Sequence, residues 1–411
     1  MTKLTPKEFY RKDLDKLYRF LTPRYARILR VKEDNLYAKG KYDYIIIDNL
    51  VGDLKDIQSF FTKVRALTND GGRVIVTYYN HFWEPILKFA TFLGFREVKH
   101  EQNWLDNEDI ANLLNLSGFD VITMQRRLLM PLNIPFVSAI LNKWLAHLPL
   151  INSLCLTTFA VARPKSSGKR EYSVSIVVPA RNEEGNIPKI VRSIPKFGKW
   201  QEIIFVEGHS KDNTWKEILR EVQKKHTKHR IVKAYKQNGK GKADAVRYGF
   251  SKANGEILMI LDADLSVDPN DLEKFYDALA QGMGEFANGS RLVYPMEKQA
   301  MRSLNKLGNK IFSVLFTWIL GQRFKDTLCG TKALFAKDYK WIAKNRKIFG
   351  KFDPFGDFDL IFGAVKKNLK VVEIPVRYRE RKYGSTNITR FKHGLQLLFM
   401  TWVAFRKFKA W

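Results

Sequence analysis

Three short and almost uninterrupted apolar runs in the second half of the chain constrain its fold most strongly. They span residues 173–178, 201–206 and 256–261, and each is followed by polar or acidic residues. Runs of this kind are typical of strands buried on both faces of a parallel sheet. Helix-like segments separate them, so the sequence predicts an α/β fold whose strand ends meet at one cleft.

A polar, basic segment containing Pro, Ser and Gly separates this half from an earlier α/β region. We expect an N-terminal domain at 1–163, a linker at 164–171, a second domain at 172–388 and an amphipathic basic helix at 389–411. These boundaries follow from composition and from the change of pattern along the chain.

The first half contains a strand-helix-turn-strand pattern. It predicts a strand at 42–49, a helix at 54–67, a turn at 69–72 and a strand at 73–78. This order is a βαβ unit, which again indicates a parallel sheet.

The net charge of the protein limits the classes of partner that it is expected to bind. Its 411 residues include 71 Lys and Arg against 42 Asp and Glu, a net charge of +29. Such an excess favours an acidic counterpart: nucleic acid, an anionic bilayer or phosphorylated molecules. Apolar residues make up 45% of the chain, which excludes an intrinsically disordered protein.

Cysteine usage and hydropathy predict the compartment. Cys155 and Cys329 are too few for a disulfide framework or a four-cysteine zinc site, which favours a reducing environment. No segment approaches 18 unbroken apolar residues, and the N-terminus lacks the apolar core of a signal peptide. We therefore expect a cytoplasmic chain.

Two carboxylates follow the third strand of the second half. Asp262 and Asp264 are separated by Ala263, and at a strand end they can present oxygens to Mg²⁺ or Mn²⁺. Such an ion would stabilise a departing diphosphate. A turn or a helix cap would account for the same two acids, so the pair alone leaves both readings open.

Residues 172–411 resemble the family 2 glycosyltransferases of the GT-A fold, and most of all the polyprenyl-phosphate sugar transferases such as the dolichyl-phosphate mannose synthases. Seven motifs occur in the family's order, at 178–184, 206–214, 239–243, 262–265, 289–291, 326–332 and 373–381. The resemblance implies a nucleotide-sugar donor and Mg²⁺ or Mn²⁺, held by Asp262 and Asp264.

The same resemblance implies roles for individual residues. The donor-binding residues are Pro179, Arg181, Glu183, Val206, Glu207, Lys240, Lys242, Asp262 and Ala263. The acceptor-phosphate residues are Arg291 and Arg302, and the catalytic residues are Asp264, Asp359 and Arg381.

The sequence departs from the family pattern at three places. The acidic cluster after the second strand is reduced to Glu207-Gly-His209, a frequent glutamine is Ser266, and a usual lysine is missing from 384–387. These departures leave the nucleotide base and one metal ligand open.

Two acceptor classes remain possible. A sugar hydroxyl must lose a proton as it attacks and benefits from a carboxylate base, for which Asp359 is the candidate. A phosphate is already ionised and needs cations instead, which Arg291, Arg302 and Arg381 would supply. The helix dipole alone would also account for an acid at position 359.

The C-terminal helix has an apolar stripe with basic residues on both sides. The stripe comprises Leu395, Leu398, Phe399, Trp402 and Phe405. This pattern suits a helix lying on an anionic bilayer, and it equally suits a helix packed on its own domain. We expect peripheral association with the inner face of the cell membrane.

Residues 42–125 resemble the later strands of a class I S-adenosylmethionine methyltransferase. The expected first strand, 27–31, has no glycine after it, although a glycine-rich loop holds the cofactor in that family. We therefore interpret the N-terminal domain as a partial Rossmann-like remnant that does not bind S-adenosylmethionine.

The leading hypothesis is an inverting, metal-dependent glycosyltransferase acting on a polyprenyl phosphate or another membrane-associated glycan acceptor. A methyltransferase is one alternative. A basic nucleic-acid-binding protein is another, although the sequence shows no recognised nucleic-acid module and we expect no specific nucleic-acid partner.

Overall fold

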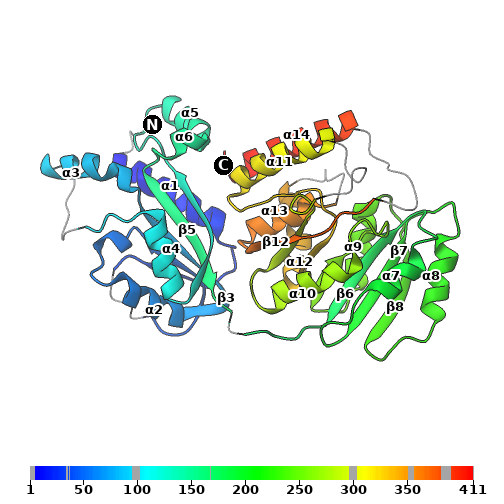
Figure 1. Ribbon diagram of the computed structural model, residues 1–411. Helices are drawn as coiled ribbons and strands as arrows, with labels where there is room; N and C mark the ends of the chain where they lie inside the picture. The colour runs from blue at the N-terminus through cyan, green and yellow to red at the C-terminus, as the bar shows by residue number, and fades with distance from the viewer. Residues whose placement is uncertain are drawn as a thin grey trace. The chain divides into compact units, whose positions relative to one another are not determined.

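The computed structural model describes residues 5–33, 36, 38–94, 102–166, 168–295, 303–349, 356–380 and 390–410. They form two compact units, which we call the N-terminal unit (Met1–Ser166 with Lys409–Trp411) and the C-terminal unit (Ser167–Phe408). Each unit has a sheet of its own (Figure 1). The chain is thus a mixed α/β protein.

The sheet of the N-terminal unit has the strand order β1-β2-β3-β5-β4. Its first three strands are parallel, and β5 is antiparallel to both β3 and β4. The strands are β1 (Ile28–Val31), β2 (Tyr42–Asp48), β3 (Thr68–Tyr79), β4 (Phe119–Arg127) and β5 (Thr157–Pro164).

Helices cover both faces of this sheet. Alternate residues of β2 point to opposite sides, so Ile46 packs with α1 (Pro6–Leu21) while Ile45 packs with α2 (Ile57–Leu67) and α4 (Asn107–Leu116). Three further helices lie in the connections between strands. They are α3 (Glu84–Phe92) after β3, α5 (Val137–Lys143) after β4, and α6 (Pro149–Asn152) before β5.

The predicted turn at 69–72 is wrong, because these residues belong to β3. Tyr42 pairs with Thr68 but Tyr44 pairs with Arg73, so the intervening residues of β3 bulge out of the ladder. A side chain at Gly72 would lie 2.9 Å from the Asn69 carbonyl oxygen, so the bulge requires glycine there.

The sheet of the C-terminal unit has the strand order β12-β10-β11-β9-β6-β7-β8. The strands β9, β6, β7 and β8 are parallel neighbours, whereas β11 is antiparallel to both β9 and β10. Their bounds are β6 (Val174–Ala180), β7 (Gln201–Glu207), β8 (Arg230–Lys236), β9 (Ile257–Ile260), β10 (Phe286–Ser290), β11 (Lys332–Phe335) and β12 (Val371–Pro375). The three predicted strands are therefore β6, β7 and β9.

Helices also flank both faces of this second sheet. One face packs against α7 (Ile187–Ser193), α8 (Thr214–Gln223) and α10 (Leu272–Ala280). The other packs against α9 (Lys242–Lys252), where a side chain at Gly249 would lie 2.4 Å from Val177. The helices α12 (Ala336–Asn345) and α13 (Phe358–Lys366) contact each other, and Tyr339 of α12 contacts Phe250 of α9.

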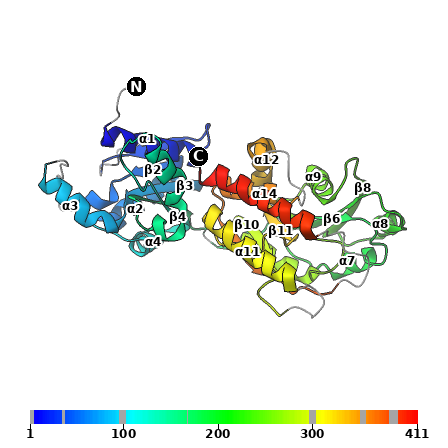
Figure 2. The same ribbon diagram turned by 90° about the horizontal axis from the view of Figure 1, so that it is seen from above.

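Two longer helices, α11 (Ser303–Leu320) and α14 (Arg390–Phe408), run side by side in the C-terminal unit (Figures 1 and 2). The Trp318 and Phe405 rings, 5.7 Å apart, join them. Among the described residues, no helix combines the length and the hydropathy needed to cross a bilayer.

Candidate active site

The carboxyl ends of β9, β6, β7 and β8 lie next to one another. Pro179 is the register partner of Val206, and Ala180 is the partner of Glu207. The predicted donor residues Pro179 and Val206 therefore lie on adjacent strands at the edge where open α/β sheets bind ligands.

The loops after β6 and β7 are tied together by hydrogen bonds. The Asn182 backbone N–H donates to Ser210 Oγ at 3.0 Å, and the Glu183 N–H donates to Thr214 Oγ1 at 2.8 Å. Asn182 has a φ of 57°, the left-handed conformation that asparagine tolerates better than most residues. The loops thus form a preorganised rim, on which Arg181 is exposed.

The acids predicted on this rim accept hydrogen bonds from its backbone and side chains. Glu207 is buried and accepts the Ser210 N–H at 2.5 Å, while Glu183 accepts from Asn186 Nδ2 at 2.7 Å. His209 Nε2 lies 3.0 Å from the Gly239 carbonyl oxygen, which links this rim to the loop after β8. These contacts give Glu207 and His209 a role in shaping the rim.

Asp262 and Asp264 follow β9 directly and have different surroundings. Asp262 Oδ1 lies 2.5 Å from Lys242 Nζ, and about a quarter of the Asp262 side chain, 26%, is exposed. Asp264 is buried and its Oδ1 accepts the Ser266 N–H at 3.0 Å. Ser266 thus supports the turn through its backbone, and Ala263 between the acids is buried.

Lys242 is surrounded by carboxylates. Burial lowers the pKa of Lys242, but Asp262, Asp357 and Asp264 outweigh burial and raise that pKa above its ordinary value. The ammonium group is therefore charged at neutral pH. Lys240, two residues earlier, is exposed.

Gly330 lies against the Asp262–Lys242 pair. A Cβ at this position would lie 2.1 Å from Asp262 Oδ2 and 2.2 Å from Lys242 Nζ. Real Cβ atoms do not approach other atoms so closely, so only glycine leaves the pair intact.

Asp262 and Asp264 supply a donor set that suits a hard divalent cation. Magnesium is commonly held by one or two carboxylates together with substrate phosphates and water. In the described part of the chain, no group of three or more His, Cys, Asp or Glu side chains forms a preassembled metal site. The two acids therefore fit an ion that arrives with a diphosphate.

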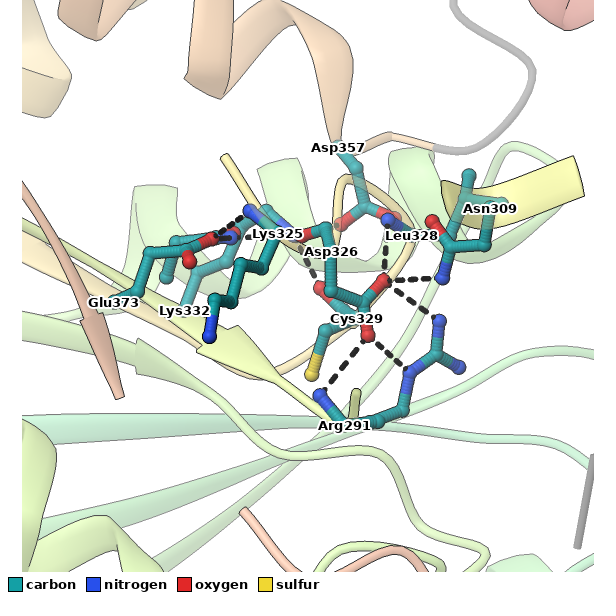
Figure 3. A network of polar contacts seen from close by, with 10 residues as sticks. Arg291, Asn309, Lys325, Asp326, Leu328, Cys329, Lys332, Asp357 and Glu373 are labelled. Atoms are coloured by element: carbon teal, nitrogen blue, oxygen red, sulfur yellow. Dashed lines mark hydrogen bonds and ion pairs between the residues drawn. The ribbon is translucent and has the colours of Figure 1, made fainter. Parts of the chain in front are cut away.

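Arg291, predicted to bind the acceptor phosphate, forms a buried ion pair with Asp326 (Figure 3). Its Nε lies 2.7 Å from Asp326 Oδ2 and its Nη2 lies 2.9 Å from Oδ1. Asn309 Nδ2 and the Leu328 N–H also donate to Asp326. Burial raises the pKa of Asp326, but the Arg291 guanidinium outweighs it and lowers the pKa to about 2.

Asp359, the predicted base, is held by two arginines. Its Oδ2 accepts from Arg247 Nη2 at 3.0 Å and from Arg346 Nε at 2.8 Å. Asp357, two residues earlier, interacts electrostatically with Lys242 and lies 3.1 Å from Lys332 Nζ. Of these two acids, Asp357 is the one connected to the Asp262 cluster.

Two other predicted residues, Arg302 and Arg381, lie outside the described residues, as does the segment 384–387. The roles expected for them remain predictions.

Sequence reasoning missed three participants in the site: Asp326, Gly330 and Asp357. The first two belong to the motif 326–332, whose glycine was a signal of close packing. Nothing in the sequence distinguishes Asp357 from Asp359, because the choice depends on the direction each side chain takes from the start of α13.

Part of the chain is similar in sequence to known proteins. Residues 175–349 match the family model of glycosyl transferase family 2. The glycosyltransferase AglJ of Haloferax volcanii is 27% identical over 224 residues, which are 54% of this chain and 68% of that protein. The UDP-N-acetylglucosamine–dolichyl-phosphate N-acetylglucosaminyltransferase of Methanococcus voltae is 24% identical over 55% of this chain and 93% of its own length.

One further relative and one solved structure are also similar to this chain. The dolichyl-phosphate β-glucosyltransferase of Drosophila melanogaster is 29% identical over 61% of this chain and 80% of its own length. The crystal structure of glucosyl-3-phosphoglycerate synthase from Mycobacterium tuberculosis covers 58% of this chain and 80% of its own, at 15% identity and a TM-score of 0.39. A score of this size does not establish a common fold. Together these sequence similarities show that the protein is a glycosyltransferase.

Proposed function

We propose that this enzyme transfers a sugar from a nucleotide-sugar donor to a polyprenyl phosphate of the dolichyl type, with inversion and with a divalent cation, on a GT-A fold. The observation that carries the proposal is the Asp262–Lys242 pair, with Asp264 beside it, at the carboxyl end of a parallel strand. The relatives from Methanococcus and Drosophila, whose names specify dolichyl phosphate, support the acceptor class.

The surroundings of Asp359 favour a phosphate over a hydroxyl acceptor. A general base needs a carboxylate oxygen directed at the substrate, but Asp359 Oδ2 already accepts from two guanidinium groups. A phosphate oxygen carries its own negative charge and attacks without losing a proton. The acceptor then needs cations rather than a base.

The reaction follows from these assignments. A phosphate oxygen of the acceptor attacks the anomeric carbon from the face opposite the leaving group, and a new carbon–oxygen bond forms. The bond from that carbon to the nucleoside diphosphate breaks, and the diphosphate leaves with the electron pair. Asp262 and Asp264 would hold a divalent ion, which when bound neutralises charge on the diphosphate.

The exposed faces of α11 and α14 support peripheral binding to an anionic membrane. Leu397, Met400 and Ala404 of α14 are buried in the unit, while most of the predicted stripe points outward. Leu307, Ile311 and Val314 of α11 are exposed, as are Leu395, Leu398, Phe399 and Trp402 of α14. The helix therefore packs on its own unit by one face and offers the other to lipid.

We also infer that the N-terminal unit is a methyltransferase-like remnant without cofactor binding. Its first strand, β1, leads into Lys32 and Glu33 rather than into a glycine-rich loop. Calorimetry of the intact protein with S-adenosylmethionine tests this, and heat of binding at micromolar affinity would contradict it.

The test of the main proposal is a transfer assay with labelled UDP- and GDP-sugars, Mg²⁺ or Mn²⁺, and dolichyl phosphate in anionic vesicles. We expect label to become extractable into organic solvent and to require both the phosphate group and the metal. Transfer to dolichol itself, or to glycan hydroxyls only, would contradict a phosphate acceptor.

Membrane binding has a separate test with matched variants. Leu395→Glu should weaken sedimentation with phosphatidylglycerol vesicles about tenfold or more, since burying one leucine contributes about 1.5–3 kcal/mol. Ile231→Glu is the control, because Ile231 is 51% exposed on β8, the edge strand of the sheet, and belongs to neither helix. Equal losses in the two variants would show that charge alone is responsible.

A further inference from the structure

The pairing of Lys242 with Asp262 bears on how a metal enters the site. Nζ lies 2.5 Å from Oδ1, at the acid that is expected to bind the ion. Gly330 closes the pair on one side, since a Cβ there would lie within 2.2 Å of Nζ. A side chain at position 330 would therefore displace Lys242 or Asp262.

We propose that Lys242 competes with the divalent cation for Asp262 and, once displaced, binds the diphosphate of the donor. The claim that Lys242 binds the donor diphosphate rests on the proposed function. The claim that Lys242 competes with the metal concerns only Asp262 and the metal.

Electrostatics makes the competition necessary. An ion bound at Asp262 would lie about 2.1 Å from a carboxylate oxygen, and an ammonium held at the same carboxylate would be only a few ångströms from it. Two positive charges at that separation repel strongly in a partly buried site. The metal can therefore bind Asp262 well only if the ammonium moves away.

Lys242 has room to move and a place to go. One third of its side chain, 33%, is exposed, and its stem has four rotatable bonds. Lys242 is also the first residue of α9, so the displaced ammonium stays beside the first turn of that helix. Backbone N–H groups of a first turn favour phosphate, which would bring the two cationic elements onto the same anion.

A purely structural ion pair predicts the opposite behaviour. If Lys242 only held Asp262 in place for the metal, its loss would weaken metal binding. Competition predicts that its loss strengthens metal binding and weakens diphosphate binding. The signs of the two effects therefore decide between the roles.

The first experiment measures Mn²⁺ binding to the full chain without nucleotide, by the electron paramagnetic resonance signal of free Mn²⁺. Lys242→Met should bind Mn²⁺ about fivefold more tightly than wild type, the equivalent of an ion pair of about 1 kcal/mol. Lys252→Met is the control, since it removes the same charge from the other end of α9, where Nζ lies over the Tyr248 ring. It should change the affinity less than twofold.

A second variant keeps the proposal testable if Lys242→Met fails to fold. Lys242→Arg retains the charge and can hold a carboxylate with two hydrogen bonds, so it should bind Mn²⁺ more weakly than wild type. An affinity series of Met above Lys above Arg is expected. Equal affinities for Lys242→Met and Lys252→Met, or weaker binding by Lys242→Met, would overturn the proposal.

The second experiment adds the anion. With saturating Mg²⁺, Lys242→Met should bind UDP, GDP or pyrophosphate about tenfold more weakly than wild type, the loss expected for one charge-assisted contact. Unchanged binding would overturn the diphosphate role. If the wild-type protein binds none of the three probes, the proposed function fails, while the Mn²⁺ series still decides whether Lys242 competes for Asp262.

Discussion

Both units place an acid at the end of a buried parallel strand, yet they use it differently. Asp48 ends β2 of the N-terminal unit and accepts from the Tyr18 hydroxyl at 2.8 Å and from Arg30 Nη2 at 2.6 Å. Asp262 follows β9 of the C-terminal unit and pairs with the flexible side chain of Lys242. The first acid is fixed by two neighbours from its own fold, whereas the second can exchange its partner.

The comparison shows that an acid at a strand end does not by itself make a site. What distinguishes the C-terminal unit is the close approach of Gly330 to Asp262 and the second acid, Asp264, two residues later. The four predictions below test this difference between the units.

Replacing the motif acid should have the largest effect. Asp264→Asn keeps the acceptor for the Ser266 N–H and removes only the charge. We expect transfer to fall about 10³-fold, since a bound metal contributes several kcal/mol to such a step and about 1.4 kcal/mol is tenfold. The readout is kcat in the vesicle assay, together with the melting temperature.

Asp48→Asn is the matched control in the other unit. It should lower the melting temperature by a few degrees and leave kcat within twofold. If the two variants lost activity equally, the strand-end acids would be equivalent and the comparison would fail.

Breaking the buried ion pair of Asp326 should cost the most stability. Asp326→Asn leaves Arg291 without a counter-charge in the interior, a change that costs about 3–5 kcal/mol. Asp13→Asn breaks the Asp13–Arg127 pair of the N-terminal unit. This pair is less buried, and we expect its loss to lower the free energy of unfolding by about 2 kcal/mol.

Hydrogen–deuterium exchange separates these two effects, because it reports on peptides from each unit. Faster exchange should appear in α11 and β10 for Asp326→Asn, and in α1 and β4 for Asp13→Asn. Uniform exchange changes across both units would contradict the assignment of each pair to its own core.

The N-terminal unit should respond to acid through His147. Burial lowers the pKa of His147 to about 4 from its ordinary 6.5. The folded state therefore favours the neutral imidazole. The contribution of His147 to folding stability is fully present above pH 6.5 and is lost as the pH falls towards 4. A shift of this size corresponds to at most about 3 kcal/mol.

Calorimetry of the full chain at pH 7 and pH 5 measures this loss. In His147→Gln the drop in melting temperature between the two pH values should be smaller than in wild type. An identical drop in the two proteins would exclude His147 as the titrating group.

Periodicity and motif order predicted much of the fold. The apolar runs correspond to β6, β7 and β9, and the family match covers most of the motifs. The turn at 69–72 was mispredicted because two consecutive glycines indicate either a turn or a bulge, and only the pairing with β2 decides. Strand pairing is not visible in a single sequence.

The sequence predicted the positions of the acidic residues of the site, but it did not predict which residues form ion pairs in the site. Asp262 and Asp264 follow a strand in the sequence itself, so their position could be inferred. That Asp326 neutralises Arg291, or that Arg247 and Arg346 hold Asp359, depends on contacts between segments 13 to 112 residues apart. A lone sequence carries no record of such pairs.

The smallest expected effect belongs to the close packing of Gly330 against Asp262. Gly330→Ala would place a methyl group 2.1 Å from Asp262 Oδ2, and the side chains of Asp262 and Lys242 must shift to admit it. Because both are flexible, we expect the fold to persist and the kcat to fall about tenfold, the effect of about 1.4 kcal/mol in the transition state. Gly71→Ala is the control in the N-terminal unit, since nothing lies within 4 Å of its Cβ position. Full activity in Gly330→Ala would show that the pair tolerates crowding, and the two units would then differ only in their acids.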